Sequence, residues 1–115
     1  MGMRIDQVKI GPVLVIKPMD KRIDASSALA FKAALAEWIQ GGERRIVLNL
    51  SEVDFIDSTG LGAIVSSLKA MGGEGDLVIC NPRETVMSLF RLTRMNRVFP
   101  ILPSEAEAVA SLSKM

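Results

Sequence analysis

The chain has 115 residues, which is the usual size of one domain. Apolar residues make up 49% and charged residues 23%, a balance typical of a globular domain and not of a disordered chain. With 14 basic and 13 acidic residues the formal net charge is +1, so the basic excess that sequence-independent nucleic-acid binding requires is missing.

The N-terminal segment predicts a hairpin of two antiparallel strands. Residues Met3 to Ile10 mix apolar and polar side chains as a strand does, and Gly11-Pro12 marks a turn. The apolar run from Val13 to Ile16 predicts a short buried strand. Pro18 ends this strand, because proline has no N–H to donate to a neighbouring strand.

A helix is expected from about Ala25 to Gln40. Its apolar residues recur at the spacing of a helical stripe, and Gly41-Gly42 follows it as a stop signal. Asp24 or Ser26 is placed to cap its start, because short polar side chains accept hydrogen bonds from the free N–H groups of a first helical turn.

The middle of the chain predicts a strand, a helix and a strand. The continuous apolar run Ile46-Val47-Leu48 is typical of a strand that is covered on both faces. After Asp57 the apolar period becomes helical, and this helix ends at Gly72-Gly73. The run from Leu77 to Cys80 predicts another buried strand. The apolar stripe of the helix consists of Leu61, Ile64, Val65 and Leu68.

The C-terminal part predicts a helix, an edge strand and a last helix. Asn81-Pro82-Arg83-Glu84 offers an N-cap residue, a proline at the first helical position and a glutamate at the third. Val98 to Leu102 predicts a strand, and Pro100 places it at the edge of a sheet. Ser104 to Glu107 has the pattern of a capping box that opens the last helix.

The expected fold is a single α/β domain over residues 1–115 with the element order ββαβαβαβα. Strands that alternate with helices form right-handed parallel crossovers, so only the initial hairpin is antiparallel. The predicted sheet is therefore mixed but mostly parallel, with flanking helices.

The chemistry of the chain excludes several classes of site. There is no histidine, which excludes histidine-based triads and metal sites, and Cys80 is the only cysteine. Cys80 lies in an apolar run and is expected to be a buried, inert thiol. No stretch approaches the about 20 apolar residues of a membrane span. We therefore expect a cytoplasmic protein that is not an enzyme and carries no cofactor or metal.

The segment from Asp54 to Gly62 is the most informative one, because it follows a central strand and opens a helix. In one interpretation Asp57 or Ser58 only caps the helix, and Gly60 and Gly62 only permit close packing. A dinucleotide site is disfavoured, since Val65 stands where a third glycine would be needed. In a third interpretation Ser58 is a modification site, because a phosphate is tolerated at a helix N-terminus.

A resemblance favours the third interpretation. The run from Ile46 to Gly62, with its block Asp57-Ser58-Thr59-Gly60-Leu61-Gly62, resembles the signature of STAS domains, specifically of bacterial anti-sigma factor antagonists. The similarity continues through Leu89 to Thr93 and Arg97 to Ile101. It therefore covers nearly the whole chain.

The resemblance implies partner switching controlled by phosphorylation. In that family the unphosphorylated antagonist binds an anti-sigma factor that is also its serine kinase, of the histidine-kinase-like ATPase type, and so frees a sigma factor or another client. The kinase phosphorylates a serine at the position of Ser58, and a metal-dependent serine phosphatase reverses this. The alternative is a STAS scaffold or transporter-associated subunit that does not switch.

The resemblance also assigns supporting residues. Asp24 matches an acidic residue that the family places near the serine, and Asp57 matches the acidic residue directly before it; a pure helix-capping role remains open for both. The other residues of the implied switch surface are Thr59, Gly60, Leu61 and Gly62. A small hydrolase using Asp57 or Asp24 is the least favoured class. No direct nucleic-acid or membrane partner is implied.

The chain departs from the family pattern in two places. Lys21-Arg22-Ile23-Asp24 stands where the family often has Gly-Glu-Leu-Asp, and Asn49 stands where it often has Asp. In addition, Arg91, Arg94 and Arg97 recur every three residues. We expect them to form a solvated helix face, with a partner-contact patch as the alternative and nucleic-acid binding as a weaker one.

Overall fold

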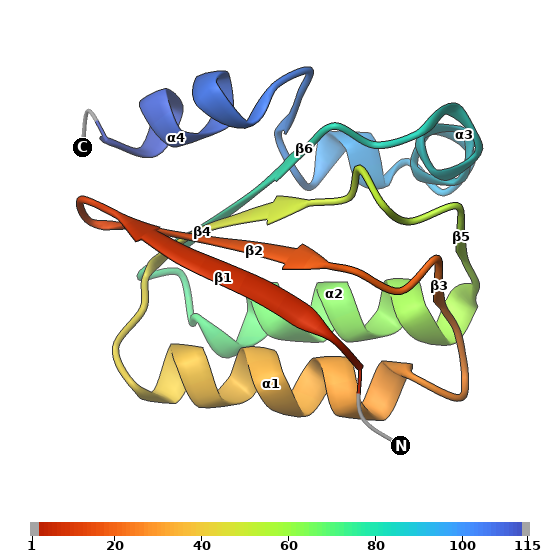
Figure 1. Cartoon of the computed structure of the whole chain (residues 1–115), viewed down its shortest axis with the longest axis horizontal. Coiled ribbons are helices and arrows are strands. Elements are labelled where there is room, and N and C mark those ends of the chain that lie inside the picture. The colour runs from red at the N-terminus through yellow and green to blue at the C-terminus, as the bar shows by residue number, and fades with distance from the viewer. Residues whose placement is uncertain (1–2, 114–115) are drawn as a thin grey trace.

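The computed structural model describes residues 3–113, and Figure 1 shows a twisted sheet with helices on both faces. The main sheet has five strands in the order β1-β2-β4-β6-β7. These strands span Ile5–Ile10 (β1), Val13–Pro18 (β2), Arg45–Asn49 (β4), Asp76–Cys80 (β6) and Ile101–Leu102 (β7). Only β1 and β2 pair antiparallel, and the other three pairings are parallel. The predicted α/β class and the mixed, mostly parallel sheet are confirmed.

The described residues also form four α-helices. They span Ala28–Gln40 (α1), Ser58–Ala70 (α2), Glu84–Leu92 (α3) and Glu105–Ser113 (α4), and a short 3-10 helix η1 spans Met95–Arg97. The helices α1 and α2 lie side by side on one face and run in the same direction, while α4 lies on the opposite face (Figure 1). No helix within residues 3–113 has the length and apolar character that crossing a lipid bilayer would require.

The alternation of side chains along the strands produces one core on each face. In β4, Ile46 and Leu48 belong to the larger core with α1 and α2, whereas Val47 points to the smaller core with α4. All three are completely buried, as expected for a central strand covered on both faces. The smaller core also contains Ala108 and Leu112 of α4.

A second, two-stranded sheet was not predicted. It pairs β3 (Arg22–Ile23) with β5 (Phe55–Ile56) in parallel. Strands of two residues are too short to show an alternating pattern, so no periodicity could reveal them. Their buried side chains, Ile23 and Ile56, join the larger core.

The expected start of the helix after residue 80 is wrong. The N-cap residue is Arg83, not Asn81, and α3 begins at Glu84. Asn81 has a positive φ of 56°, and its N–H donates to the Leu102 carbonyl at 3.1 Å. Asn81 therefore still extends the β6–β7 ladder, and the turn into the helix comes later.

Two further expectations near the C-terminus need correction. The strand expected from Val98 to Leu102 contains only Ile101–Leu102, because Val98 and Phe99 donate their N–H groups to the Met95 carbonyl. The expected edge position is confirmed. The three arginines do not share a helix face, since α3 ends at Leu92 and Arg94 adopts a left-handed φ of 61°.

The expected inert character of Cys80 agrees with its position. Its side chain is completely buried in the smaller core. Burial, and after it the charge of Glu105, raises the pKa of the thiol to about 12. The reactive thiolate is therefore scarce at neutral pH.

We predict that thiol reagents label Cys80 only through unfolding. A rise from the ordinary pKa of 9.0 to about 12 lowers the thiolate fraction at neutral pH roughly a thousandfold, in addition to the steric protection. The labelling rate with iodoacetamide, followed by mass spectrometry, should rise with urea concentration as the unfolded population grows. Labelling of the folded protein as fast as the urea-unfolded chain would contradict this.

Candidate functional site

The small β3–β5 sheet brings two loops together at one edge of the molecule. Arg22 lies opposite Phe55 and Ile23 opposite Ile56, and the Asp57 N–H donates to the Ile23 carbonyl at 3.2 Å. The chain then enters α2 at Ser58, and the other loop enters α1 at Ala28. The N-termini of the two parallel helices therefore lie next to each other (Figure 1).

The Asp57 carboxylate holds this edge together. As the N-cap of α2, its Oδ1 accepts hydrogen bonds from the Gly60 N–H at 2.9 Å and the Thr59 hydroxyl at 2.6 Å. Its Oδ2 accepts from the Ala25 N–H of the other loop at 3.1 Å. The Thr59 hydroxyl, and then the Gly60 amide, lower the pKa of Asp57, so the carboxylate is charged at neutral pH. Asp57 thus caps α2 and also ties the two loops to each other.

Asp24 is held on the neighbouring loop. Its Oδ1 accepts from the Ser26 hydroxyl at 2.6 Å and the Ser26 N–H at 3.0 Å, and its Oδ2 accepts from Arg22 Nε at 3.2 Å. The Ser26 hydroxyl, followed by Arg22, lowers the pKa of Asp24. The expected N-cap of α1 at Asp24 or Ser26 is wrong. The N-cap is Ser27, whose side chain makes no capping hydrogen bond to the helix, and the helix starts three residues later than expected from about Ala25.

Ser58 and Thr59 differ in what their hydroxyl groups do. Both residues are exposed. The Thr59 hydroxyl is committed to Asp57, whereas the Ser58 hydroxyl has no hydrogen-bond partner within residues 3–113. Ser58 is therefore the hydroxyl at this edge that is free to react. The described residues contain no cluster of three side chains that could hold a metal ion.

Gly60 and Gly62 have different environments, although the motif suggests the same role for both. A Cβ on Gly60 would lie 2.3 Å from the Ile23 carbonyl oxygen, so the close approach of α2 to β3 requires glycine there. A Cβ on Gly62 would meet no atom within 4 Å. The expected packing role is therefore wrong for Gly62, which is exposed, while Leu61 packs against the larger core.

Sequence reasoning missed several contacts that shape this edge. The Arg22 guanidinium lies over the Phe55 ring, 4.3 Å from its centroid, and Phe55 is exposed. Arg83 pairs with Asp54 at 3.0 Å, and the Thr85 hydroxyl donates to the Asp54 carbonyl at 2.7 Å, so the start of α3 is attached to β5. No local pattern joins residues so far apart in sequence.

Comparisons with known proteins place this geometry in context. A family model described as STAS domain matches residues 4–108. The chain is 31% identical over 90 residues to BtrV of Bordetella bronchiseptica, which is named as a candidate anti-sigma factor antagonist; the alignment covers 77% of this chain and 78% of BtrV.

Solved structures give the same result. The chain is similar to the crystal structure of a Thermotoga maritima protein described as a candidate anti-sigma factor antagonist, with a TM-score of 0.88, 27% identity and coverage of 95% and 94% of the two chains. It also matches the anti-sigma factor antagonist SpoIIAA in its unphosphorylated form, with a TM-score of 0.72, 20% identity and coverage of 98% and 99%. At that identity the likeness to SpoIIAA shows the fold alone.

We predict opposite effects of alanine at the two glycines. Gly60→Ala forces a methyl group into the Ile23 backbone and should destabilise the protein by about 1–3 kcal/mol. Gly62→Ala meets open space and should stabilise it by about 0.5–1 kcal/mol, because glycine weakens a helix interior. Urea unfolding of both variants measures the difference, and a loss of stability in Gly62→Ala would contradict the geometry.

Proposed function

Because the chain belongs to the STAS domain family, we propose that it is an anti-sigma factor antagonist that works by partner switching in the cytoplasm. In its unphosphorylated form it binds an anti-sigma factor that is also a serine kinase of the histidine-kinase-like ATPase type, and the client sigma factor is released. Phosphorylation of Ser58 dissolves the complex, and a metal-dependent serine phosphatase restores the binding form. The chain itself performs no catalysis.

The observation that carries this proposal is the free hydroxyl of Ser58 at the exposed N-terminus of α2. A kinase needs a hydroxyl that is accessible and not engaged in holding the fold. Ser58 meets this requirement, whereas the neighbouring Thr59 hydroxyl donates to the cap residue Asp57. The relative BtrV and the Thermotoga maritima protein, both described as candidate anti-sigma factor antagonists, support the same function.

A phosphate on Ser58 changes binding much more than folding. It adds about −1.5 to −2 charges at neutral pH. The helix N-terminus attracts this charge by about 0.3–1 kcal/mol, and the carboxylate of Asp57 opposes that attraction, so the two effects on stability partly cancel. Docking, however, would strip water from the phosphate, and burying an unpaired charge costs several kcal/mol.

The direct test is phosphorylation in solution. The protein is incubated with ATP and a candidate anti-sigma factor kinase of the histidine-kinase-like ATPase type, and intact and fragment mass spectrometry locates the product. We expect one phosphate on Ser58 and none in Ser58→Ala. Phosphate on Thr59 with Ser58 unmodified would overturn the assignment, and an unmodified protein would favour the scaffold or transporter-associated subunit.

We predict that the charge at residue 58 controls binding to the kinase. Ser58→Ala should bind permanently, whereas Ser58→Asp should bind at least about a hundredfold more weakly, which corresponds to roughly 2.7 kcal/mol. Calorimetry measures the affinity, and thermal melts should show that both variants stay folded. Ser111→Asp places the same charge on α4, on the opposite face of the sheet, and should bind like the wild type. Equal affinities of the two Ser58 variants would contradict the switch.

A further inference from the structure

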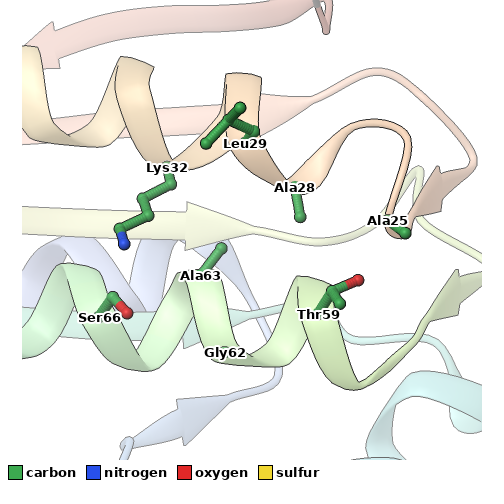
Figure 2. A pocket seen from close by; sticks show the side chains of 8 residues that line it. All are labelled: Ala25, Ala28, Leu29, Lys32, Thr59, Gly62, Ala63 and Ser66. Carbon is green, nitrogen blue, oxygen red and sulfur yellow. The ribbon is translucent and has the colours of Figure 1, made fainter.

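A groove runs between α1 and α2 and begins beside the candidate switch residue. Figure 2 shows its walls, with α1 on one side and α2 on the other. Its volume is about 390 Å³, and it is lined by Ala25, Ala28, Leu29, Lys32, Thr59, Gly62, Ala63 and Ser66. A smaller hollow that shares Lys32 and Ser66 continues along the same two helices as far as Ile39 and Ala70. The groove therefore starts one residue from Ser58 and follows the helix pair.

Gly62 keeps this groove deep, and the fold gives no other reason for a glycine there. It lies in the interior of α2, where glycine is less stable than alanine. It is exposed, and a Cβ added to it would meet no atom within 4 Å. The effect of Gly62 is that the backbone of α2 itself forms part of the groove wall, so a partner side chain can approach it closely.

The groove combines an apolar rim with an unpaired cation. Leu29 is 79% exposed and presents its apolar side chain at the groove. Lys32 extends from α1 toward α2 across the groove (Figure 2), and it forms no ion pair with any residue from 3 to 113. None of the lining residues is acidic. The surface is therefore complementary to an apolar group that lies next to a negative charge.

We propose that this groove receives a segment of the anti-sigma factor kinase that presents an apolar side chain and a carboxylate about one helical turn apart. The apolar side chain packs against Leu29 and the backbone at Gly62, and the carboxylate pairs with Lys32. This inference rests on the proposed function and adds the surface and the chemistry by which the partner is recognised.

The charge of Lys32 and the open shape of the groove distinguish this occupant from a second copy of the chain and from a small ligand. A second copy of the chain docked symmetrically on the groove would bring two Lys32 side chains toward each other, since a two-fold contact uses the same patch on both subunits. A small ligand needs a site that encloses most of its surface, whereas Leu29, Lys32 and Gly62 are all exposed along this groove.

The position of the groove also explains why phosphorylation would release this segment. Thr59 lines the end of the groove, so a phosphate on Ser58 would stand directly beside it. The added negative charge would repel the partner carboxylate that Lys32 holds, and it would compete with that carboxylate for Lys32. The ion pair between Lys32 and the partner carboxylate would then form in the unphosphorylated complex and break after phosphorylation.

The test compares two groove variants with matched controls outside it. Gly62→Leu fills the groove with a good helix former, and Lys32→Glu reverses its charge. Lys69→Leu and Lys69→Glu make the same kinds of change at an exposed position of α2 that does not line the groove. We expect the affinity for the kinase, measured by calorimetry, to fall at least about tenfold in each groove variant and less than about threefold in each control.

Additional measurements separate the possible causes. Thermal melts should show Gly62→Leu at least as stable as the wild type, and the salt dependence of binding should be weaker in Lys32→Gln. If the wild type binds the kinase and both groove variants bind it with the same affinity, the inference is overturned and the proposed function stays intact. A wild type that does not bind the kinase at all would overturn both. Sedimentation that shows a wild-type dimer dissolved by Gly62→Leu would identify a second copy as the occupant and overturn the inference.

Discussion

The bond from Asp57 to two different loops is the interaction on which the rest of this edge depends. One carboxylate oxygen organises the first turn of α2, and the other accepts the Ala25 N–H that precedes α1. The backbone hydrogen bonds around the β3–β5 pairing also join the two loops, but the Asp57 carboxylate is the side chain that bonds to both of them. Because Asp57 also occupies the Thr59 hydroxyl, the same interaction leaves Ser58 as the free hydroxyl. The contacts by which Asp57 stabilises this edge are therefore also the contacts that leave the Ser58 hydroxyl free.

The groove follows from the parallel course of the two helices. Right-handed crossovers between parallel strands place α1 and α2 on the same face with their N-termini at the same edge. Close packing at Gly60 brings α2 against β3, while small side chains farther along leave space between the helices. Ser58 and the end of the groove lie at the same edge, so the topology itself makes the proposed switch residue and the proposed docking surface neighbours.

The sequence predicts those parts of the fold that have a period. The strands β2, β4 and β6 are continuous apolar runs, and α1 and α2 have regular apolar stripes, so their existence and order could be derived. The pairing of β3 with β5 could not, because two residues have no period and their contact lies between distant segments.

At the candidate site the capping role of Asp57 followed from residue types and spacing, whereas its bond to Ala25 did not. The different environments of Gly60 and Gly62 could not be predicted either, because the sequence shows that both residues are small but not which atoms lie beside each of them. The position of Asn81 shows a related limit. Its residue type favours a helix cap, but its N–H donates to the Leu102 carbonyl, so Asn81 extends the strand ladder and the helix begins later.

The position of α4 has a consequence for the order in which the chain acquires its structure during synthesis. This last helix covers the face of the sheet to which Val13, Val15 and Val47 point, and Glu105 at its start accepts a hydrogen bond from the buried Asn49 amide at 2.9 Å. Until the residues of α4 leave the ribosome, that face of the sheet has no cover. A nascent or truncated chain without α4 therefore exposes this apolar strip, which makes it a substrate for chaperones and prone to aggregation.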